Sequence, residues 1–302
     1  MISIIVCTYN RDKYLYGALQ CIATNGFSAD SYEIILVNNN STDDTEKECI
    51  RFQSDYPEVK FRYFLETAQG LSFARNRGIK ESRGEILLFL DDDSFVQKDY
   101  LVNLVRNLRD YPDADAFGGK ITPLFESGVT PEWLAKWNKS WISAIDLGNR
   151  VKLFKKGKYP IGANMGIRRS CLEAVGDFNT KLGRSRKNLM GGEEKDIFNR
   201  IRNQGGKIYY FPDVEVQHII PPSRTTKEFI CKMGEGIGMS ERIRTLDISR
   251  WSYMKRLFME LVKWGGTLVL WLGFALKGQF KKGNMLVVFR KMVTKGLLTR
   301  SC

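Results

Sequence analysis

EILLFLDDDSF, residues 85–95, is the stretch that decides the fold, because five apolar residues run directly into Asp91, Asp92 and Asp93. A short and continuously apolar run predicts a strand that is buried on both faces. Acidic side chains at its carboxyl end stand where open α/β sheets bind their ligands. Because three neighbouring anions repel one another, a bound cation would stabilise them. Taken alone, however, such a triplet is more typical of a solvated acidic turn or a helix cap.

The residues before this stretch alternate between strand and helix patterns. We predict strands at 2–6, 33–37, 59–64 and 86–90, with helices at 12–25, 43–52 and 71–82 between them. This rhythm predicts a mostly parallel sheet with helices on both faces. The strands end in polar residues at 8–11, 38–40 and 91–93, which parallel strands would gather at one edge of the sheet. Farther along, we predict helices at 98–110, from 169 and at 197–206, and a strand at 207–220.

Three tryptophans, Trp133, Trp137 and Trp141, follow one another at intervals of four residues. This spacing predicts a stripe on one face of a helix. The sequence leaves two interpretations of the stripe open. Either the helix packs on the body of the protein, or the rings form a stacking platform for a sugar or a lipid.

The positive charge is concentrated near the end of the chain. The 302 residues carry a net charge of +13, and residues 221–302 contribute +11 of it, with 16 Lys and Arg against 5 Asp and Glu. Such a tail predicts an anionic partner, whether a membrane surface, a nucleic acid or an acidic ligand.

The cysteines favour a cytosolic setting, and the first residues indicate a strand. Six cysteines are scattered along the chain without a CxxC spacing, which favours reduced thiols over a disulfide framework. The opening residues MISIIVCTYNR lack a basic start before their short apolar run. They therefore predict a first strand in place of a signal peptide.

The basic tail also contains the longest apolar run, the 13 residues from Trp264 to Leu276. A spanning helix needs about 20 residues, so this run is too short by itself. It fits a buried helix, a re-entrant segment or an interfacial helix. The lysines and arginines on both sides favour an anionic membrane surface, and the alternative is a helix packed on the body or on a second copy of the chain.

Seven segments of the chain together resemble the successive signatures of the family 2 glycosyltransferases of GT-A fold. They are VCTYNR, ILVNNNSTDDT, GLSFARNRGI, EILLFLDDDSFV, GANMGIRRSCLEAVGDFN, GGEEKDIFNRI and VQHII. The resemblance implies an α/β, Rossmann-like GT-A catalytic domain over residues 1–220, with a mostly parallel central sheet flanked by helices. Residues 221–302 would then form a basic, amphipathic, helical extension.

The activity that the resemblance implies is that of a hexosyltransferase of class EC 2.4. Such an enzyme moves a sugar from a nucleotide-diphosphate sugar, most commonly a UDP-sugar, to an acceptor hydroxyl with inversion at the anomeric carbon. The acceptor would be a saccharide or a lipid-linked saccharide in bacterial surface polysaccharide or glycolipid synthesis. The enzyme would lie in the cytoplasm, peripheral at the cytoplasmic face of the membrane.

The resemblance places nucleotide recognition at the first two strand ends. Thr8, Tyr9 and Arg11 match the residues that frame the base in the family. Asn38, with Asn39 beside it, stands where the family commonly has an aspartate that accepts a hydrogen bond from the pyrimidine N3–H. An asparagine carbonyl also accepts such a bond, so uridine stays possible and the identity of the base stays open.

The resemblance assigns the diphosphate and its metal ion to the aspartate triplet. Asp91 and Asp93 match the outer positions of the family's DxD motif, with Asp93 as the direct ligand of Mg²⁺ or Mn²⁺ and Asp92 in the variable middle position. Arg75 matches an arginine near the diphosphate, although a solvated helix face is the alternative. His218 matches a histidine that completes the metal shell, although a lone histidine is more often structural.

The acidic segment GGEEKD matches the family's catalytic base. Glu194 aligns with the aspartate that takes the acceptor proton, and Glu193 aligns with the preceding glutamate. Because a glutamate replaces the aspartate, the choice between the two stays open, and we favour Glu194. Acids at a helix start also have a structural interpretation, since they complement the helix dipole. Asn164 would line the pocket between donor and acceptor, with Trp133 and Trp137 on the acceptor side.

Two other functions remain to be tested against this one. A polyprenyl-phosphate glycosyltransferase would use a lipid phosphate as its acceptor. A nucleic-acid-binding protein would use the basic tail, but the chain lacks a recognition-helix signature and the interleaved surface aromatics of a known module. We therefore expect no nucleic acid partner.

Overall fold

The computed structural model describes residues 1–185 and 189–299. Within these residues the chain forms two compact units. The sheet unit comprises residues 1–124, 143–179 and 194–219, and the helical unit comprises 125–142, 180–193 and the chain from 220 onward. The predicted domain boundary after residue 220 stays a prediction. In the structure, the segments 125–142 and 180–193 belong to the helical unit together with the last part of the chain. Five of the six cysteines are free thiols, and Cys302 lies outside the described residues.

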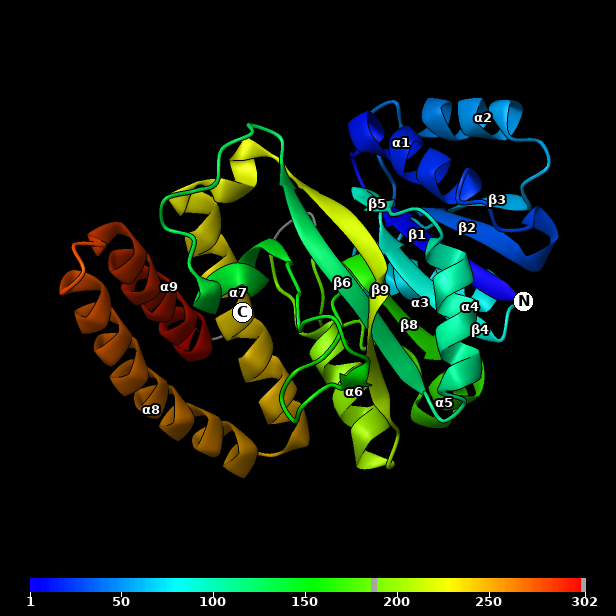
Figure 1. The fold of residues 1–302 in the computed structure, drawn as a ribbon. Helices are drawn as coiled ribbons and strands as arrows, with labels where there is room; N and C mark the ends of the chain where they lie inside the picture. The colour runs from blue at the N-terminus through cyan, green and yellow to red at the C-terminus, as the bar shows by residue number, and fades with distance from the viewer. Residues whose placement is uncertain (186–188, 300–302) are drawn as a thin grey trace. The chain divides into compact units, whose positions relative to one another are not determined.

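The described strands form one sheet in the order β3-β2-β1-β4-β8-β6-β9-β5, with β7 paired to β9 (Figure 1). The strands are β1 (Ile2–Thr8), β2 (Tyr32–Asn38), β3 (Phe61–Leu65), β4 (Ile86–Asp91), β5 (Ser94–Val96), β6 (Ala116–Phe125), β7 (Lys152–Leu153), β8 (Met165–Arg168) and β9 (Ile208–Ile220). The first four pair in parallel, as the alternating pattern predicts. The later pairs β4–β8, β6–β8, β5–β9 and β7–β9 are antiparallel.

The predicted helices of the sheet unit are confirmed, with small shifts at their ends. They are α1 (Asp12–Ala23), α2 (Thr45–Asp55), α3 (Leu71–Glu81), α4 (Tyr100–Asp110), α5 (Arg169–Val175) and α6 (Glu193–Asn203), with short 3-10 turns at Ala29–Ser31 (η1) and Gly162–Asn164 (η3). The apolar stripe predicted for α1 is its buried face, formed by Leu15, Ala18, Leu19 and Ile22. All five apolar residues of β4 before Asp91 are buried as well, so the predicted doubly covered strand is also confirmed.

Strand register brings the polar strand ends together. Thr8 pairs with Asn38 across β1 and β2, and Cys7 pairs with Asp91 across β1 and β4. Parallel strands in register end at the same edge of a sheet. The predicted gathering of polar residues at this edge is therefore confirmed.

The tryptophan-rich segment does not form the predicted single helical face. Its short 3-10 stretch η2 (Lys136–Ile142) is broken at Asn138, whose φ of −118° and ψ of 15° are not helical. The Asn138 side chain accepts a hydrogen bond from the Ala135 N–H at 2.7 Å, which competes with the helical pattern. Trp133 is buried and its indole donates to the Thr225 carbonyl at 3.0 Å, whereas Trp137 is 67% exposed.

The helical unit contains η4 (Pro222–Thr225), α7 (Lys227–Ile248), α8 (Arg250–Ala275) and α9 (Phe280–Leu298) (Figure 1). Glycines let α7 and α9 approach backbone to backbone. A Cβ on Gly296 would lie 2.0 Å from the Glu235 carbonyl oxygen, and one on Gly238 would lie 2.2 Å from the Val293 carbonyl oxygen. Helix α8 has 26 residues, twice the apolar run seen in the sequence. By length and composition alone it is the one described helix that could cross a membrane.

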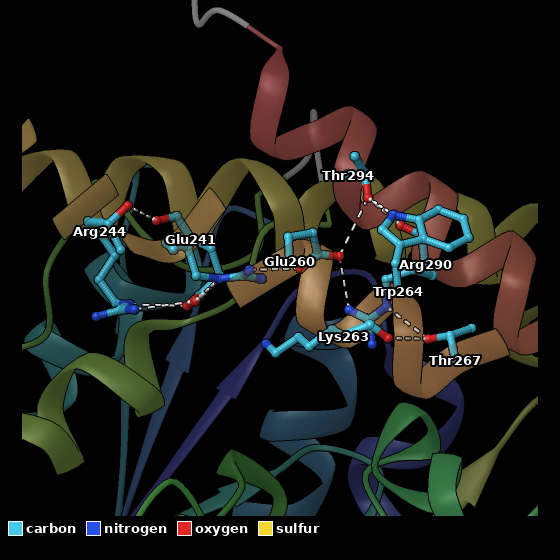
Figure 2. Close-up of polar contacts among 10 residues, drawn as sticks. Glu241, Arg244, Glu260, Lys263, Trp264, Thr267, Arg290 and Thr294 are labelled. Atoms are coloured by element: carbon cyan, nitrogen blue, oxygen red, sulfur yellow. Dashed lines mark hydrogen bonds and ion pairs between the residues drawn. The ribbon is translucent and has the colours of Figure 1, made fainter. Parts of the chain in front are cut away.

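A buried network of ion pairs joins the three helices (Figure 2). The Glu260 carboxylate of α8 accepts hydrogen bonds from Arg256 at 2.7 Å and from Arg290 of α9 at 3.0 Å. Arg256 also donates to Glu241 of α7 at 3.0 Å, and Arg244 donates to the same carboxylate at 3.1 Å. Burial acts to raise the pKa of Glu260, but the hydrogen bonds and charges of Arg256 and Arg290 hold it below its ordinary value. Because buried charges are tolerated only when paired, the network fixes how these helices pack.

Replacing Glu260 with glutamine should destabilise the helical unit by about 3 kcal/mol, because Arg256 and Arg290 would then be buried without their shared carboxylate. Urea unfolding followed by tryptophan fluorescence measures this, since all six tryptophans lie in the helical unit. The control is Glu228→Gln, which removes an exposed partner of Lys232 and should leave the curve unchanged. Identical curves for Glu260→Gln and the wild type would contradict the role of the network.

The same carboxylate predicts a pH dependence of stability. Because the folded pKa of Glu260 lies below the ordinary 4.5, its contribution is complete above that value and is lost as the pH falls through the lowered folded pKa. Urea unfolding repeated between about pH 7 and pH 3 should therefore show a steeper loss of stability in the wild type than in Glu260→Gln. Parallel pH profiles of the two proteins would argue against this origin of the acid sensitivity.

Candidate active site

Asp91, Asp93 and His218 form one cluster in the sheet unit. One ligand atom from each lies within 4.8 Å of the others. Asp91 ends β4, and Asp93 directly precedes β5. The antiparallel pairing of β5 with β9 sets Ser94 opposite His218, which brings the histidine Nε2 to 3.0 Å from Asp93 Oδ1. The ladder thus joins residues that are far apart in the sequence.

The donor set of this cluster fits a divalent cation. Carboxylate oxygens are the ligands that Mg²⁺ and Mn²⁺ prefer, and imidazole is a common metal ligand. The side chains of Asp93 and His218 are each 1% exposed, so water screens the Asp93 charge and that of a bound cation only weakly. Asp91 is partly exposed, which leaves one side of the cluster open to a ligand.

Arg11 lies on this acidic cluster. Its Nη1 is 3.1 Å from Asp93 Oδ2, whereas His218 faces the other oxygen of the same carboxylate. Burial acts to lower the pKa of the Arg11 guanidinium, but Asp92, Asp93 and Asp91 together raise it. The arginine is therefore a fixed positive charge beside the aspartates. Its implied role in framing the base stays a prediction.

Asp92 differs from the aspartates on either side of it. It is buried, and burial together with the charge of Asp93 raises its pKa to about 7, against the opposing effects of Arg11 and a hydrogen bond with Thr8. The group whose ligand atoms lie within 4.8 Å of one another consists of Asp91, Asp93 and His218, and Asp92 is not part of it. This difference is consistent with the variable middle position that the sequence assigned to Asp92.

The amides at the end of β2 organise their own loops. The Asn38 carbonyl oxygen accepts from the Ser41 N–H at 2.8 Å, and its amide donates to the Tyr63 hydroxyl at 2.9 Å. The Asn39 amide donates to two carbonyls before α3, and its oxygen accepts from the Gly70 N–H at 2.8 Å. A carbonyl oxygen has two lone pairs, so Asn38 can still accept one further hydrogen bond. Thr8 is buried and Tyr9 is partly exposed at the neighbouring strand end.

Arg75 and Glu194 form a second charged group in the sheet unit. Glu194 Oε1 lies 3.4 Å from Arg75 Nη2 and accepts a hydrogen bond from the Gly162 N–H at 3.0 Å. The guanidinium is buried and lies 5.3 Å from the Phe178 ring centre. A Cβ on Gly162 would lie 1.9 Å from Arg75 Nη2 and 2.8 Å from Glu194 Oε1. The pair therefore requires glycine at position 162.

The first turn of α6 presents its two glutamates differently. The Glu194 side chain is 17% exposed, whereas Glu193 is 2% exposed. A general base must reach the proton that it removes. Among the described residues, the contacts of Glu194 with Arg75 and Gly162 are both made by Oε1. Oε2 takes part in neither contact, and the choice of Glu194 over Glu193 as the base stays a prediction.

Asn164 serves as a bridge between elements of the sheet unit. Its oxygen accepts from the buried Tyr100 hydroxyl at 2.6 Å, and its amide donates to the Lys120 carbonyl at 3.1 Å and the Val214 carbonyl at 2.8 Å. Its predicted place between donor and acceptor stays a prediction. The contributions of Tyr100 and of the Gly162 N–H were not predicted from the sequence, because a core tyrosine and a backbone amide leave no distinctive pattern.

Known proteins resemble the chain in sequence. The model of Glycosyl transferase family 2 matches residues 3–176. A glucosyl-dolichyl phosphate glucuronosyltransferase of Haloferax volcanii is 23% identical over 254 residues, which cover 81% of this chain and 77% of that protein. The succinoglycan biosynthesis protein ExoM of Rhizobium meliloti is 27% identical over 236 residues, which cover 76% of this chain and 71% of that protein.

A solved structure resembles the chain in fold. The mannosyltransferase PcManGT from Pyrobaculum calidifontis, in complex with GDP-Man and Mn²⁺, superposes with a TM-score of 0.63 at 18% sequence identity. The match covers 98% of this chain and 87% of that one. At this identity the likeness shows the fold, and the predicted GT-A fold with helices after the catalytic sheet is confirmed.

Replacing Asp93 with asparagine should weaken Mn²⁺ binding by about 100-fold or more, since even outer-shell changes at metal sites cost 10–100-fold. Electron paramagnetic resonance of free Mn²⁺ during titration of the full chain measures this. The control is Asp113→Asn, an exposed carboxylate that pairs with Lys207 and should leave the affinity unchanged. Equal Mn²⁺ affinity in Asp93→Asn and Asp113→Asn would exclude Asp93 as a ligand.

Proposed function

Because the chain belongs to glycosyl transferase family 2, we propose that it is a metal-dependent inverting enzyme that uses a nucleotide-diphosphate sugar. The donor is a UDP-sugar, and the acceptor is a hydroxyl of a saccharide or a lipid-linked saccharide in polysaccharide or glycolipid synthesis. The observation that carries this proposal is the Asp91, Asp93 and His218 cluster, which lies in the same compact unit as the Arg75–Glu194 pair.

Donor binding is proposed for the polar strand ends. Arg11 stands beside Asp93, where a fixed guanidinium would attract a diphosphate. The remaining acceptor capacity of the Asn38 oxygen suits the N3–H of a uracil. Asp91, Asp93 and His218 would hold Mg²⁺ or Mn²⁺, which supplies positive charge to the leaving diphosphate.

Proton removal is proposed for Glu194. As the acceptor oxygen bonds to the anomeric carbon, the bond from that carbon to the diphosphate breaks and the nucleotide diphosphate departs. Oε2 of Glu194 takes the hydroxyl proton. The Arg75 guanidinium lies 3.4 Å from the other oxygen of this carboxylate, and the Gly162 N–H fixes its orientation. Attack from the side opposite the leaving group inverts the configuration.

A lipid phosphate is the second candidate acceptor. The observation that favours it is the long helix of membrane-compatible composition in the helical unit. The Haloferax volcanii relative is named for glucosyl-dolichyl phosphate, whose phosphate is already esterified on both sides, so that name fits the lipid-linked saccharide acceptor of the first candidate. A phosphate acceptor is already ionised, so its attack needs little help from a base. We also propose that residues 1–220 form the catalytic domain, and that the basic extension from 221 onward holds the enzyme at the cytoplasmic face of the membrane.

Glu194→Gln should lower kcat by about 10²–10⁴-fold, because the amide cannot accept the hydroxyl proton. A thermal-shift screen of nucleotide sugars with Mn²⁺ first identifies the donor, and release of the nucleotide diphosphate then reports turnover on saccharide and lipid-linked acceptors. Asp93→Ala should remove nearly all activity, whereas the control Asp92→Ala should retain most of it. Full activity in the double variant Asp93→Ala/Glu194→Gln would contradict the proposed metal-dependent mechanism with Glu194 as the base. Unchanged turnover in Glu194→Gln alone would favour the lipid phosphate acceptor.

Gly162→Ala should lower kcat by about 100-fold, since the new methyl group displaces Arg75 or Glu194 from their contact and small displacements at a reacting group are costly. The control is Gly266→Ala, where a Cβ meets nothing within 4 Å. Nucleotide release gives kcat, and circular dichroism checks that both variants fold. Wild-type turnover in a folded Gly162→Ala protein would show that this contact does not position the base.

A further inference from the structure

The two buried residues of helix α8, Glu260 and Thr267, are polar, whereas most of its exposed residues are apolar. Glu260 faces α9, where it pairs with Arg290 (Figure 2). Arg256 pairs with Glu260 and with Glu241 of α7. Thr267 is also buried, and its hydroxyl lies 3.3 Å from Arg290 Nε. Most of the outward residues are apolar and largely exposed, with Trp251 at 78% and Leu276 at 81%. The exposed cations Lys255 and Lys263 stand among or beside them. This is the reverse of a helix that packs on a globular core in water.

The outward residues form a regular stripe along the whole helix. Nine exposed apolar side chains make up what we call the outer stripe of α8: Trp251, Met254, Phe258, Leu261, Val262, Leu268, Val269, Leu272 and, directly after the helix, Leu276. Neighbouring members are one, three, four or six residues apart, and at about 100° per residue all of them fall within an arc of about 120° on one helical face. Met259 is exposed as well, but it lies to one side of the stripe. At 1.5 Å per residue the stripe extends about 39 Å. A continuous apolar surface of this size marks an interaction site on a soluble protein.

The buried polar network argues that this orientation of α8 is specific. Turning the helix about its axis would expose the ion pairs and break the hydrogen bond from the Trp264 indole to the Thr294 hydroxyl, which measures 3.0 Å. Helices in contact with lipid direct their polar groups toward the bundle interior, as α8 does. The close backbone contact at Gly238 and Gly296 is also of the kind that membrane helices use.

We propose that the outer stripe of α8 lies in the boundary between headgroups and acyl chains of an anionic membrane leaflet, parallel to the membrane plane. This inference rests on the proposed membrane association of the extension, and it names the surface and its orientation. It adds that only one face of one helix enters the lipid, while the ion pairs stay on the protein side.

Charge favours a membrane over a second copy of the chain as the occupant of this surface. Residues 250–299 contain ten lysines and arginines against one acid, Glu260, and that acid is buried and already paired. Two copies joined through α8 would bring two such cationic segments together, which opposes association. An anionic leaflet offers the complementary charge.

The exposed charges of helix α9 indicate that α8 lies along the membrane and does not cross it. The two helices pack in antiparallel directions, as shown by the contacts from Glu260 to Arg290 and from Trp271 to Asn284. Among the exposed residues of α9 are Lys291 and Lys295, so a crossing hairpin would carry these charges into the hydrocarbon. Charges there are rare and costly.

Vesicle binding by the full chain tests the proposal. The wild type should sediment with vesicles of mixed phosphatidylglycerol and phosphatidylcholine, and more weakly with phosphatidylcholine alone. The double variant Leu261→Glu/Val269→Glu should lose at least 10-fold in affinity, because it places two anions on the outer stripe. The matched control is Ile50→Glu, a substitution at a 63% exposed residue of α2, which should bind as the wild type does.

A second readout reports which face meets the lipid. Brominated acyl chains quench nearby tryptophans, so they should quench the wild type more strongly than Trp251→Phe. Equal vesicle binding by the double variant and the wild type overturns the proposal, as does the absence of wild-type binding, which also removes the proposed membrane association. Retention in the membrane fraction after alkaline carbonate extraction would overturn the in-plane orientation. A dimer that the double variant breaks without a change in vesicle binding would identify a second copy as the occupant.

The catalytic proposal is kept separate by measuring nucleotide release on a soluble acceptor. The double variant should keep wild-type turnover there, because α8 contributes no residue to the candidate active site. An inactive wild type that still binds vesicles through the outer stripe would reject the proposed function and leave this inference standing. If the wild type is active but its outer-stripe variant binds vesicles normally, the proposed function would stand and the membrane inference would be rejected.

Discussion

Repulsion between the carboxylates that follow β4 is the constraint on which the rest of the sheet unit depends. The parallel register of β1 and β4 fixes where Asp91 ends its strand, and two positive or polar partners must then reach Asp93 from other parts of the chain. Arg11 does so from the loop after β1. His218 does so because β5 turns back and pairs with β9. The antiparallel half of the sheet is therefore what completes a site that the parallel half begins.

The two units handle buried acids in different ways. Glu260 is closed off between Arg256 and Arg290, so that its charge contributes only to packing. Asp93 is equally buried, but its neighbour Asp91 is partly exposed, and the cluster keeps a direction from which a cation and an anionic ligand can approach. The buried charge of Glu260 therefore holds helices together, whereas the buried charge of Asp93 remains accessible to a ligand.

The local patterns of the sequence predict the first four strands, the helices between them and the gathering of polar strand ends, because each depends on a short period and one register. The antiparallel pairings and the Arg11–Asp93 contact depend on long-range ladders that leave no local pattern. The predicted tryptophan helix fails because the Asn138 side chain bonds the local backbone. Helix α8 is longer than its apolar run because it begins at Arg250, well before the run, and the polar residues Arg256 and Glu260 of this first part face inward and find partners.

The interleaving of the two units also has a consequence for how the chain folds during synthesis. Every segment of the sheet unit is made by residue 219, so this unit can fold while the last helices are still being translated. Trp133 and Trp141 belong to the helical unit, and their partners Thr225 and Phe289 come much later. The tryptophan segment therefore leaves the ribosome before its packing partners have been synthesised. A nascent chain stalled before α9 would expose this aromatic surface to chaperones.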